Sequence, residues 1–381
     1  MKKILIIYAS YGAGHKAISN YIYEYFKDRG YKVKELDILD YSSKAITKFS
    51  GGANKFMLSY APELWDIIYH STNNKLISSI NDKIQDAMLK NKKLRKFILD
   101  FNPDVVIATH YMGSFYISKL KETNLLDTKL VTIVTDYIAH QFWFGKKDRN
   151  DIIVVNNMSS KRALIKKGAD RSRIKTFGMP ISPNFIESNY DKIKIMKKLN
   201  IKGDKPVILF YGGGSLGAKT SIPYLITLLE KNVDADIFFV SGKSEELKLK
   251  AENIVKKYDA KNVHILGFIT NGPEYMTVSD FVITKPGGIT LTECICFKKP
   301  MVLIRGTGGQ ENGNCNYLVK KGYAIKAFTQ SKFGKAIELL CDNNSKLIDK
   351  MREKLEVGKI DNPMEKLYEL VENLIDESSI K

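Results

Sequence analysis

The sequence predicts an α/β protein built from two doubly wound domains, and three observations support this class. Its 381 residues exceed one ordinary hydrophobic core and fit two domains of typical size. Apolar runs rich in β-branched residues, such as 281–284, lead into glycine turns and then amphipathic segments, which is the order strand, turn, helix. One glycine and two prolines at 178–183 mark a boundary. We therefore place the domains at 1–180 and 181–358, followed by a terminal helix at 359–381.

The first domain opens with a strand at 4–9, a glycine loop at 10–15 and a helix at 17–26. Further elements follow the same alternation: strands at 31–36, 105–109, 130–135, 152–155 and 174–177, and a helix at 159–167. Ligands of such folds bind beyond the carboxyl ends of the strands, so the glycine loop is expected to face a ligand.

The second domain repeats this alternation, which predicts a mostly parallel sheet. Its first strand, 207–211, runs into the glycine-rich segment 212–217 and then a helix that reaches Leu229. The other predicted elements are a helix at 192–199, strands at 237–240, 263–266, 281–284 and 300–304, and helical structure after Thr329.

The composition is that of a soluble globular protein with a large positive charge, namely 44% hydrophobic and 27% charged residues with a formal net charge of +18. Such a charge suits nucleic acid or an anionic membrane surface, although a generally lysine-rich composition also contributes to it. The sequence contains no zinc-finger spacing, ribonucleoprotein motif or basic recognition helix. We therefore expect no nucleic-acid partner.

Four cysteines in the C-terminal half have no zinc-site spacing, so reduced thiols in a cytoplasmic protein are expected. The apolar run at the N-terminus is too short for a signal peptide, and no run approaches the roughly 20 apolar residues of a transmembrane helix. A protein of this kind that meets a membrane lies on its surface.

Aromatic and basic residues gather between residues 41 and 96. Phe56, Tyr60 and Trp65 stand among lysines, a composition that can settle into a lipid headgroup layer. Trp143 is a fourth candidate for contact with the membrane or the acceptor. The alternative is a helical insertion that packs on its own domain.

The segment 281–316 carries the residues expected to bind a nucleotide sugar. Gly287 and Gly288 open a helix, whose first amides can hold a diphosphate, while Glu293 lies one turn further on and can accept hydrogen bonds from ribose hydroxyls. The strand at 300–304 is then expected to deliver three polar side chains to a loop that reads sugar hydroxyls. These are Gln310, Glu311 and Asn314.

Other residues complete this candidate site, either as backbone near the phosphates, as side-chain donors or as a ring near the base: Gly14, Gly213, Gly214, Ser215, Phe268, Lys285, Ile289 and Thr290. Each alone also has an ordinary structural explanation, because glycine turns and polar loops occur in most α/β proteins. The order in which they follow one another favours a binding site.

His15 is the preferred general base. The positive end of the helix that begins beside it disfavours the imidazolium, which leaves a neutral ring able to accept a proton. Asp136, directly after a strand, is the second candidate and can act as the base or orient His15. His110 and His140 are weaker candidates at strand ends or loops.

Three strings, TKPGGITLTE at 284–293, GQENGN at 309–314 and GAGH at 12–15, resemble the signatures of the diacylglycerol glycosyltransferases and monogalactosyldiacylglycerol synthases. These enzymes share the GT-B fold with the peptidoglycan N-acetylglucosaminyltransferase. The resemblance implies two Rossmann-like domains facing across a cleft and a last helix that crosses back onto the first domain. It also implies an N-terminal domain that meets the lipid, and departure of UDP stabilised by helix amides, with no cofactor and no metal.

The resemblance implies an inverting transfer of a hexose, glucose or galactose, from a UDP-sugar to diacylglycerol on the inner face of the cell membrane. The partners would be a UDP-hexose, diacylglycerol and an anionic membrane surface, while the oligomeric state stays open. Three alternatives remain: a UDP-N-acetylglucosamine transferase acting on a polyprenyl-linked peptidoglycan precursor, a UDP-N-acetylglucosamine 2-epimerase, and a nucleotide-sugar-binding regulator without turnover.

Overall fold

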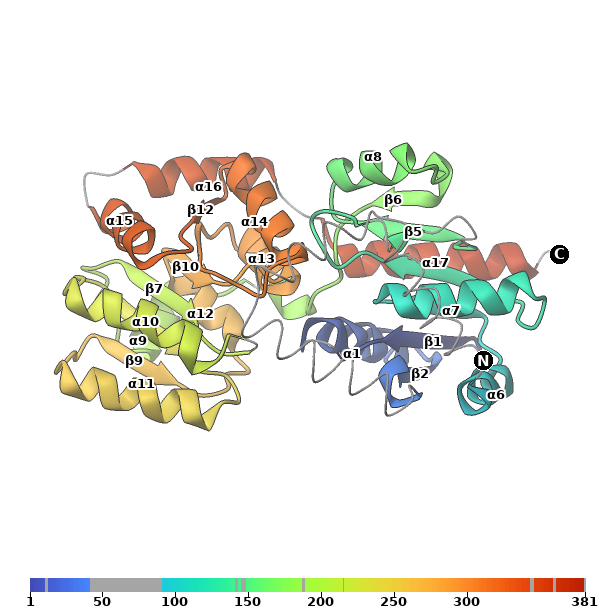
Figure 1. Ribbon diagram of the computed structural model, residues 1–381, viewed down its shortest axis with the longest axis horizontal. Helices are drawn as coiled ribbons and strands as arrows, with labels where there is room; N and C mark the ends of the chain where they lie inside the picture. The colour runs from blue at the N-terminus through green and yellow to red at the C-terminus, as the bar shows by residue number, and fades with distance from the viewer. Residues whose placement is uncertain are drawn as a thin grey trace. The chain divides into compact units, whose positions relative to one another are not determined.

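The computed structural model describes residues 1–10, 13–41, 91–140, 143–144, 149–186, 189–214, 216–342, 346–358 and 361–379. Contacts between Cα atoms divide the chain into two units. Unit 1 contains Met1–Ser182 together with Ile360–Lys381, and unit 2 contains Pro183–Lys359. Each unit is an α/β layer structure with its own sheet (Figure 1).

Unit 1 contains a sheet of six parallel strands in the order β2-β1-β3-β4-β5-β6. The strands are β1 (Lys3–Tyr8), β2 (Lys32–Asp37), β3 (Val105–Ala108), β4 (Lys129–Ile133), β5 (Ile152–Val155) and β6 (Ile174–Thr176). The helices are α1 (Ala13–Lys27), α6 (Lys92–Phe101), α7 (Tyr111–Glu122), α8 (Met158–Lys166) and α17 (Pro363–Ser379), with short 3₁₀ turns at Ile38–Tyr41 and Arg171–Arg173.

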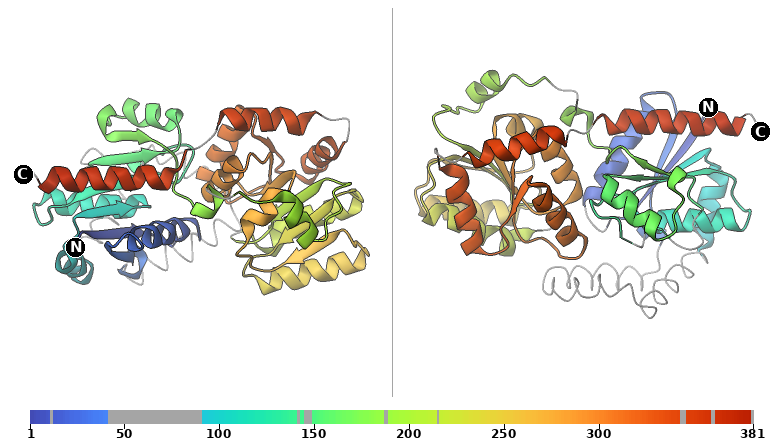
Figure 2. Two further views of the ribbon diagram at one scale, coloured as in Figure 1. Left: turned by 180° about the vertical axis from the view of Figure 1, so that it is seen from behind. Right: turned by 90° about the horizontal axis from the view of Figure 1, so that it is seen from above.

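The central strands of this sheet are apolar on both faces because helices cover both, whereas the edge strands β2 and β6 are partly exposed. Leu5 and Ile7 pack with α6 and α7 in one hydrophobic cluster. Ile4 and Ile6 alternate with them and are also fully buried, on the face that α1 and α17 cover (Figure 2). Sheets with both faces buried are built from such continuous apolar runs.

The terminal helix α17 is held against α1 by aromatic and charged contacts. The Arg29 guanidinium lies 3.5 Å from the centre of the Tyr25 ring and 5.3 Å from that of Tyr368. At the start of β1, Lys2 Nζ forms an ion pair of 3.1 Å with Glu372. These contacts hold α17 against α1 and against the start of β1.

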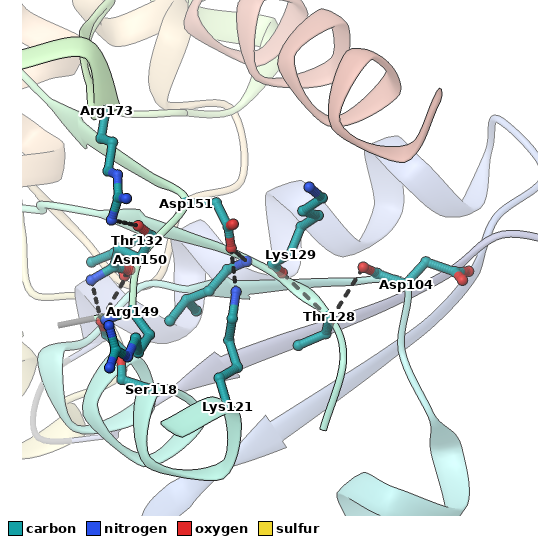
Figure 3. A network of polar contacts seen from close by, with 12 residues as sticks. Asp104, Ser118, Lys121, Thr128, Lys129, Thr132, Arg149, Asn150, Asp151 and Arg173 are labelled. Carbon is teal, nitrogen blue, oxygen red and sulfur yellow. Dashed lines mark hydrogen bonds and ion pairs between the residues drawn. The ribbon is translucent and has the colours of Figure 1, made fainter. Parts of the chain in front are cut away.

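A buried polar cluster fastens α7 to the middle of the sheet (Figure 3). The Asn150 side chain, 1% exposed, donates to Ser114 Oγ on α7 at 3.0 Å and accepts a hydrogen bond from Thr132 on β4. The Asp151 carboxylate accepts from the Leu130 amide at 2.7 Å and pairs with Lys121. Buried polar groups are stable only when paired, so this cluster sets the position of α7 and of the residues at its start.

Unit 2 has a second six-stranded parallel sheet, in the order β12-β11-β10-β7-β8-β9. Its strands are β7 (Val207–Tyr211), β8 (Asp236–Val240), β9 (Val263–Leu266), β10 (Phe281–Thr284), β11 (Met301–Leu303) and β12 (Ala324–Lys326). Its helices are α9 (Lys192–Lys198), α10 (Gly217–Glu230), α11 (Glu245–Lys257), α12 (Gly272–Val278), α13 (Gly288–Cys296), α14 (Gln310–Lys321), α15 (Gln330–Cys341) and α16 (Leu347–Val357), after a 3₁₀ turn at Pro183–Phe185.

In both sheets the strand order reverses once, and the reversal defines a place for a ligand. After β1 the chain moves to one side of the strand, and after β3 it moves to the other, so α1 and α7 leave neighbouring strands for opposite faces. The same reversal separates β7 from β10 in unit 2. In open α/β sheets, ligands bind at such switch points, beyond the carboxyl ends of the strands.

Candidate active site

The switch point of unit 1 brings two histidines together. His15 lies in the first turn of α1, directly after β1, and His110 precedes α7, directly after β3. Their ring centres are 4.8 Å apart, and the two rings meet edge to face at 85°. His110 was a weaker candidate in the sequence, and the structure places it in contact with His15.

The hydrogen bonds of His15 determine which ring nitrogen is basic. Its Nδ1 lies 2.7 Å from the backbone oxygen of Thr109 and 3.5 Å from Thr135 Oγ1. A carbonyl oxygen only accepts hydrogen bonds, so Nδ1 carries the proton and Nε2 of the neutral ring has the lone pair. Burial lowers the pKa of His15, and the bond to Thr109 offsets part of this effect. A neutral imidazole with an unprotonated Nε2 is a suitable general base.

His110 has the opposite tautomer and a capping role. The Met112 amide donates to its Nδ1 at 3.3 Å, so the proton of the neutral ring is on Nε2. Burial, and the proximity of His15, hold the pKa of His110 well below its usual range. His110 is therefore a second neutral ring in contact with His15. It restricts the positions that the His15 ring can adopt, which fits a positioning role for His110.

Asp136 and Trp143 belong to the same region of unit 1. Asp136 is half-buried on the segment after β4, where its backbone oxygen accepts from Asn156 Nδ2 at 2.9 Å. Trp143 is 5% exposed, with its ring centre 6.4 Å from that of His110. Its burial in a hydrophobic cluster argues against the predicted contact with a membrane. The other three candidates for this contact, Phe56, Tyr60 and Trp65, lie outside the described residues.

The switch point of unit 2 contains the predicted diphosphate site. Gly287 precedes α13, and Gly288, Ile289 and Thr290 form its first turn. No side chain of the described residues caps this helix start. Its amides therefore point beyond the carboxyl end of β10 without a side-chain acceptor, which is the arrangement that helix N-termini use to bind phosphate.

Glu293 is buried in α13, one turn after these amides. The side chain is 8% exposed, and no hydrogen bond or charge among the described residues offsets the effect of burial on its carboxyl group. Burial raises the pKa of Glu293 to about 7. A buried carboxylate without donors is costly, and the hydroxyl groups of a bound ribose would supply them.

The predicted sugar-reading loop is wrong in its secondary structure, because Gln310, Glu311 and Asn314 lie in the first turns of α14. Asn314 Nδ2 donates to the backbone oxygen of Pro286 at 3.1 Å. Gln310 Oε1 is buried and has no hydrogen-bond partner among the described residues. Of these three residues, Gln310 is therefore the one with a buried acceptor oxygen that lacks a hydrogen-bond donor among the described residues.

Glu311 braces the turn that precedes α13. One carboxylate oxygen pairs with Lys285 Nζ at 2.5 Å, and the other accepts from the Thr307 amide at 2.7 Å. Burial raises the pKa of Glu311, but the charge and hydrogen bond of Lys285, together with the hydrogen bonds from Thr307, lower it overall. The same carboxylate also requires glycine at 306, where an added Cβ would lie 2.1 Å from Glu311 Oε2.

Replacing Lys285 with methionine is expected to destabilise unit 2 by about 3 kcal/mol, because it leaves a buried carboxylate without its cation. Urea denaturation measures this change. Lys250→Met is the matched control, since the Lys250–Glu246 pair is exposed and should contribute under about 1 kcal/mol. Equal losses in the two variants would show that the Lys285–Glu311 pair does not brace the turn.

The glycines after β7 have separate roles. A Cβ on Gly213 would lie 2.3 Å from the backbone oxygen of Ser241, so this glycine is needed for packing between two loops. Gly214 has φ +72° and open space around it, which leaves its backbone accessible to a ligand.

The remaining candidates lie elsewhere in the two units. Phe268 is 62% exposed after β9, and Gly14 is half-buried in the first turn of α1. Ser215 lies outside the described residues.

Two consecutive regions of the chain, which together make up most of its length, each match a known protein family. Residues 15–181 match the monogalactosyldiacylglycerol (MGDG) synthase family, and residues 207–369 match the glycosyltransferase family 28 C-terminal domain. Processive diacylglycerol beta-glucosyltransferases are similar over the whole length. That of Staphylococcus haemolyticus is 29% identical and that of Staphylococcus saprophyticus 28%, each covering 99% of this chain and 94% of the relative.

Solved structures share the two-sheet fold. MurG of Acinetobacter baumannii superposes with a TM-score of 0.63 at 14% identity, covering 98% of this chain and all of that one. MnaA of S. aureus, solved with UDP, gives 0.59 at 15% identity, covering 97% of this chain and 95% of that one. These similarities establish the fold.

Within the described residues, no helix is both long enough and apolar enough to span a bilayer. That part of the chain also contains no group of three or more His, Cys, Asp and Glu side chains arranged to hold a metal ion. The chain combines a region that matches the monogalactosyldiacylglycerol synthase family with a region that matches the glycosyltransferase family 28 C-terminal domain, on the two-sheet fold of the GT-B glycosyltransferases.

Proposed function

We propose that this protein is an inverting hexosyltransferase that uses a UDP-sugar to glycosylate diacylglycerol and so makes a membrane glycolipid. One observation carries the proposal: each sheet has its candidate residues at its switch point, the basic histidine in unit 1 and the glycine-flanked helix start with Glu293 in unit 2. The relatives, which are named diacylglycerol beta-glucosyltransferases, support this substrate pair and favour glucose.

The proposed donor site lies in unit 2 and binds the UDP-sugar through backbone amides and polar side chains. The first amides of α13 hold the diphosphate, and Glu293 accepts hydrogen bonds from the ribose hydroxyls. Gln310 Oε1 accepts from a hydroxyl of the hexose. Helix amides that face the diphosphate also stabilise the charge that grows on UDP as it leaves.

The proposed reaction is a single displacement. Nε2 of His15 takes the proton of the diacylglycerol hydroxyl, and the oxygen attacks the anomeric carbon as the bond from that carbon to the diphosphate oxygen breaks. UDP departs with the bonding electron pair. Attack opposite the leaving group converts an α-linked donor into a β-glycoside. Asp136 remains the second candidate for the base.

We also propose that unit 1 provides the surface that meets the membrane, on the inner face of the cell membrane. The net charge of +18 favours binding to anionic lipid. The aromatic and basic segment at 41–96 suits an interface, and most of it lies outside the described residues.

The proposal is tested by product analysis. The full chain is incubated separately with UDP-glucose, UDP-galactose and UDP-N-acetylglucosamine, each with vesicles of diacylglycerol and anionic phospholipid, and the products are identified by mass and linkage. We expect a β-linked hexosyl diacylglycerol. Transfer only to a polyprenyl-linked acceptor, or conversion of UDP-N-acetylglucosamine in water without vesicles, would overturn the proposal.

A further inference from the structure

Two exposed apolar side chains lie beyond the carboxyl edge of the unit 1 sheet, near His15. Ile138 follows β4 and is 39% exposed, and Met158 begins α8 after β5 and is 49% exposed. The two strands are parallel neighbours, so the segments that follow them leave the same edge of the sheet. Thr135, on the segment that carries Ile138, has its Oγ1 3.5 Å from His15 Nδ1. The two apolar side chains therefore belong to the rim of the region that contains the proposed base.

Buried hydrogen bonds hold these two segments together. The backbone oxygen of Tyr137 accepts from Asn157 Nδ2 at 2.7 Å and from Ser160 Oγ at 3.0 Å. The Ala139 amide donates to the same Ser160 Oγ at 3.0 Å. Ile138 lies between the two bonded residues, so it is held beside the first turn of α8, where the second apolar side chain also lies. The exposure of both side chains is thus fixed by a paired polar network.

Positive charge continues from Met158 along α8. Arg162 and Lys166 follow it at intervals of four residues, so the three side chains lie along one face of the helix, with about 6 Å of axis between successive members. Both cations are exposed, and neither forms an ion pair with any described residue. An apolar side chain at one end of such a face and cations further along match a lipid interface, where acyl chains lie deeper than phosphates.

The positive charge extends from α8 to the neighbouring edge strand β6, which lies beside it (Figure 1). Between residues 156 and 177 the only carboxylate is that of Asp170, whereas the whole chain has 42 acidic residues against 60 basic ones. The local excess is therefore much larger than the general composition supplies, and its charge complements that of an anionic bilayer. The exposed basic side chains of this range are Arg162, Lys166, Lys167, Arg171, Arg173 and Lys175.

We infer that Ile138 and Met158 enter the acyl layer of an anionic bilayer while the cations of α8 and β6 bind its phosphates, and that this contact presents diacylglycerol to His15. The inference rests on the proposed function and deepens it, because it names the part of unit 1 that receives the acceptor. Moving two long acyl chains into water is costly, so an acceptor of this class is best received at a rim that itself enters the bilayer.

The ratio of two transfer rates, measured on the full chain, tests the apolar part of the inference. One rate is transfer to dioleoylglycerol in vesicles of phosphatidylcholine and phosphatidylglycerol, and the other is transfer to dioctanoylglycerol dispersed in water. Ile138→Ser combined with Met158→Ser should lower the ratio of vesicle rate to dispersed rate about tenfold, because less apolar surface enters the bilayer. Leu249→Ser, at a 58% exposed leucine on α11 of unit 2, is the matched control and should leave the ratio unchanged.

Arg162→Gln combined with Lys166→Gln tests the charge. Flotation of the full chain with vesicles should show that affinity for phosphatidylglycerol vesicles falls about tenfold or more, while affinity for pure phosphatidylcholine vesicles stays the same. Lys256→Gln combined with Lys257→Gln removes the same charge from the exposed face of α11 and should have little effect on either affinity.

These measurements separate failure of the inference from failure of the proposed function. If the wild type transfers hexose to neither acceptor, the proposed function itself fails. If the wild type is active and the double serine variant keeps the wild-type ratio, the inference is overturned while the proposed function stands. Equal losses of vesicle affinity in the two charge variants would also overturn it, because the cations would then act only through the net charge of the chain.

Discussion

Replacing His15 with alanine is expected to lower kcat for glycosyl transfer by about 10³-fold and to leave UDP-sugar binding nearly unchanged, since general base catalysis typically contributes 10²–10⁴-fold. The reason is geometric. Thr109 holds the proton on Nδ1 at 2.7 Å, which leaves Nε2 as the basic atom. The helix start that would bind the diphosphate belongs to unit 2 and contains no part of this ring.

The pH profile of the wild type provides an independent check. Burial lowers the pKa of His15 below the ordinary value of a histidine side chain, about 6.5. The active form of a base is deprotonated, so kcat/KM should be flat above pH 6.5 and fall only as the pH drops through the lowered pKa. A rate that instead rises steeply above pH 7 would contradict His15 as the base.

His264→Ala is the matched control for His15→Ala, because His264 is an exposed histidine on β9 and should tolerate the same substitution.

Asp136→Asn tests whether Asp136, the second candidate, is the general base instead of His15. A drop of about 10³-fold in Asp136→Asn, with a small effect in His15→Ala, would move the base role to Asp136. Loss of UDP binding together with turnover in His15→Ala would remove His15 from the role.

Glu293→Gln is expected to make the protein more stable at pH 8 and less able to bind its donor. Burial raises the pKa of Glu293 from 4.5 to about 7. The folded state therefore binds the proton more tightly than the unfolded state, and stability is lost as the pH rises from about 4.5 to about 7. The shift corresponds to an upper limit of about 3 kcal/mol that the neutral glutamine would restore at pH 8.

Urea denaturation at pH 4 and pH 8 measures this effect. The two proteins should have similar free energies of unfolding at pH 4, and the variant should be more stable at pH 8. Donor affinity at pH 8 should fall at least about tenfold, because charge-assisted hydrogen bonds to the ribose are replaced by neutral ones. Glu246→Gln, on the exposed face of α11, is the control that should alter neither quantity by much. A variant with unchanged stability and unchanged donor affinity would contradict the role of Glu293.

Much of the fold could be predicted from the sequence because most of the central strands are short apolar runs, and several of them lead into a glycine turn. The predicted strand at 281–284 and the helix after Gly287 are confirmed. The strand β12 was missed, since it has three residues and only Ala324 is buried, which is too short a pattern for periodicity to detect. The glycine and asparagine content of GQENGN suggested a loop, yet packing keeps it helical from Gln310.

The sequence indicates which polar residues follow the strands at the two switch points, but it does not indicate the partners of their side chains. Glu311 was expected to read sugar hydroxyls, and it pairs with Lys285, a residue 26 positions away in the chain. The tautomers of His15 and His110 depend on partners from other segments, so no local pattern indicates them. Trp143 looked like an interface residue from its type alone, and its burial becomes evident only once the sheet is assembled.

The initial rate of UDP release from UDP-glucose, measured with and without diacylglycerol vesicles, tests the central claim most directly. The account predicts release that requires diacylglycerol, yields one β-glucosyl diacylglycerol per UDP in the first round of transfer, and is nearly abolished in His15→Ala. Release at the same rate without diacylglycerol, or the absence of any glycolipid when both substrates are present, would contradict it.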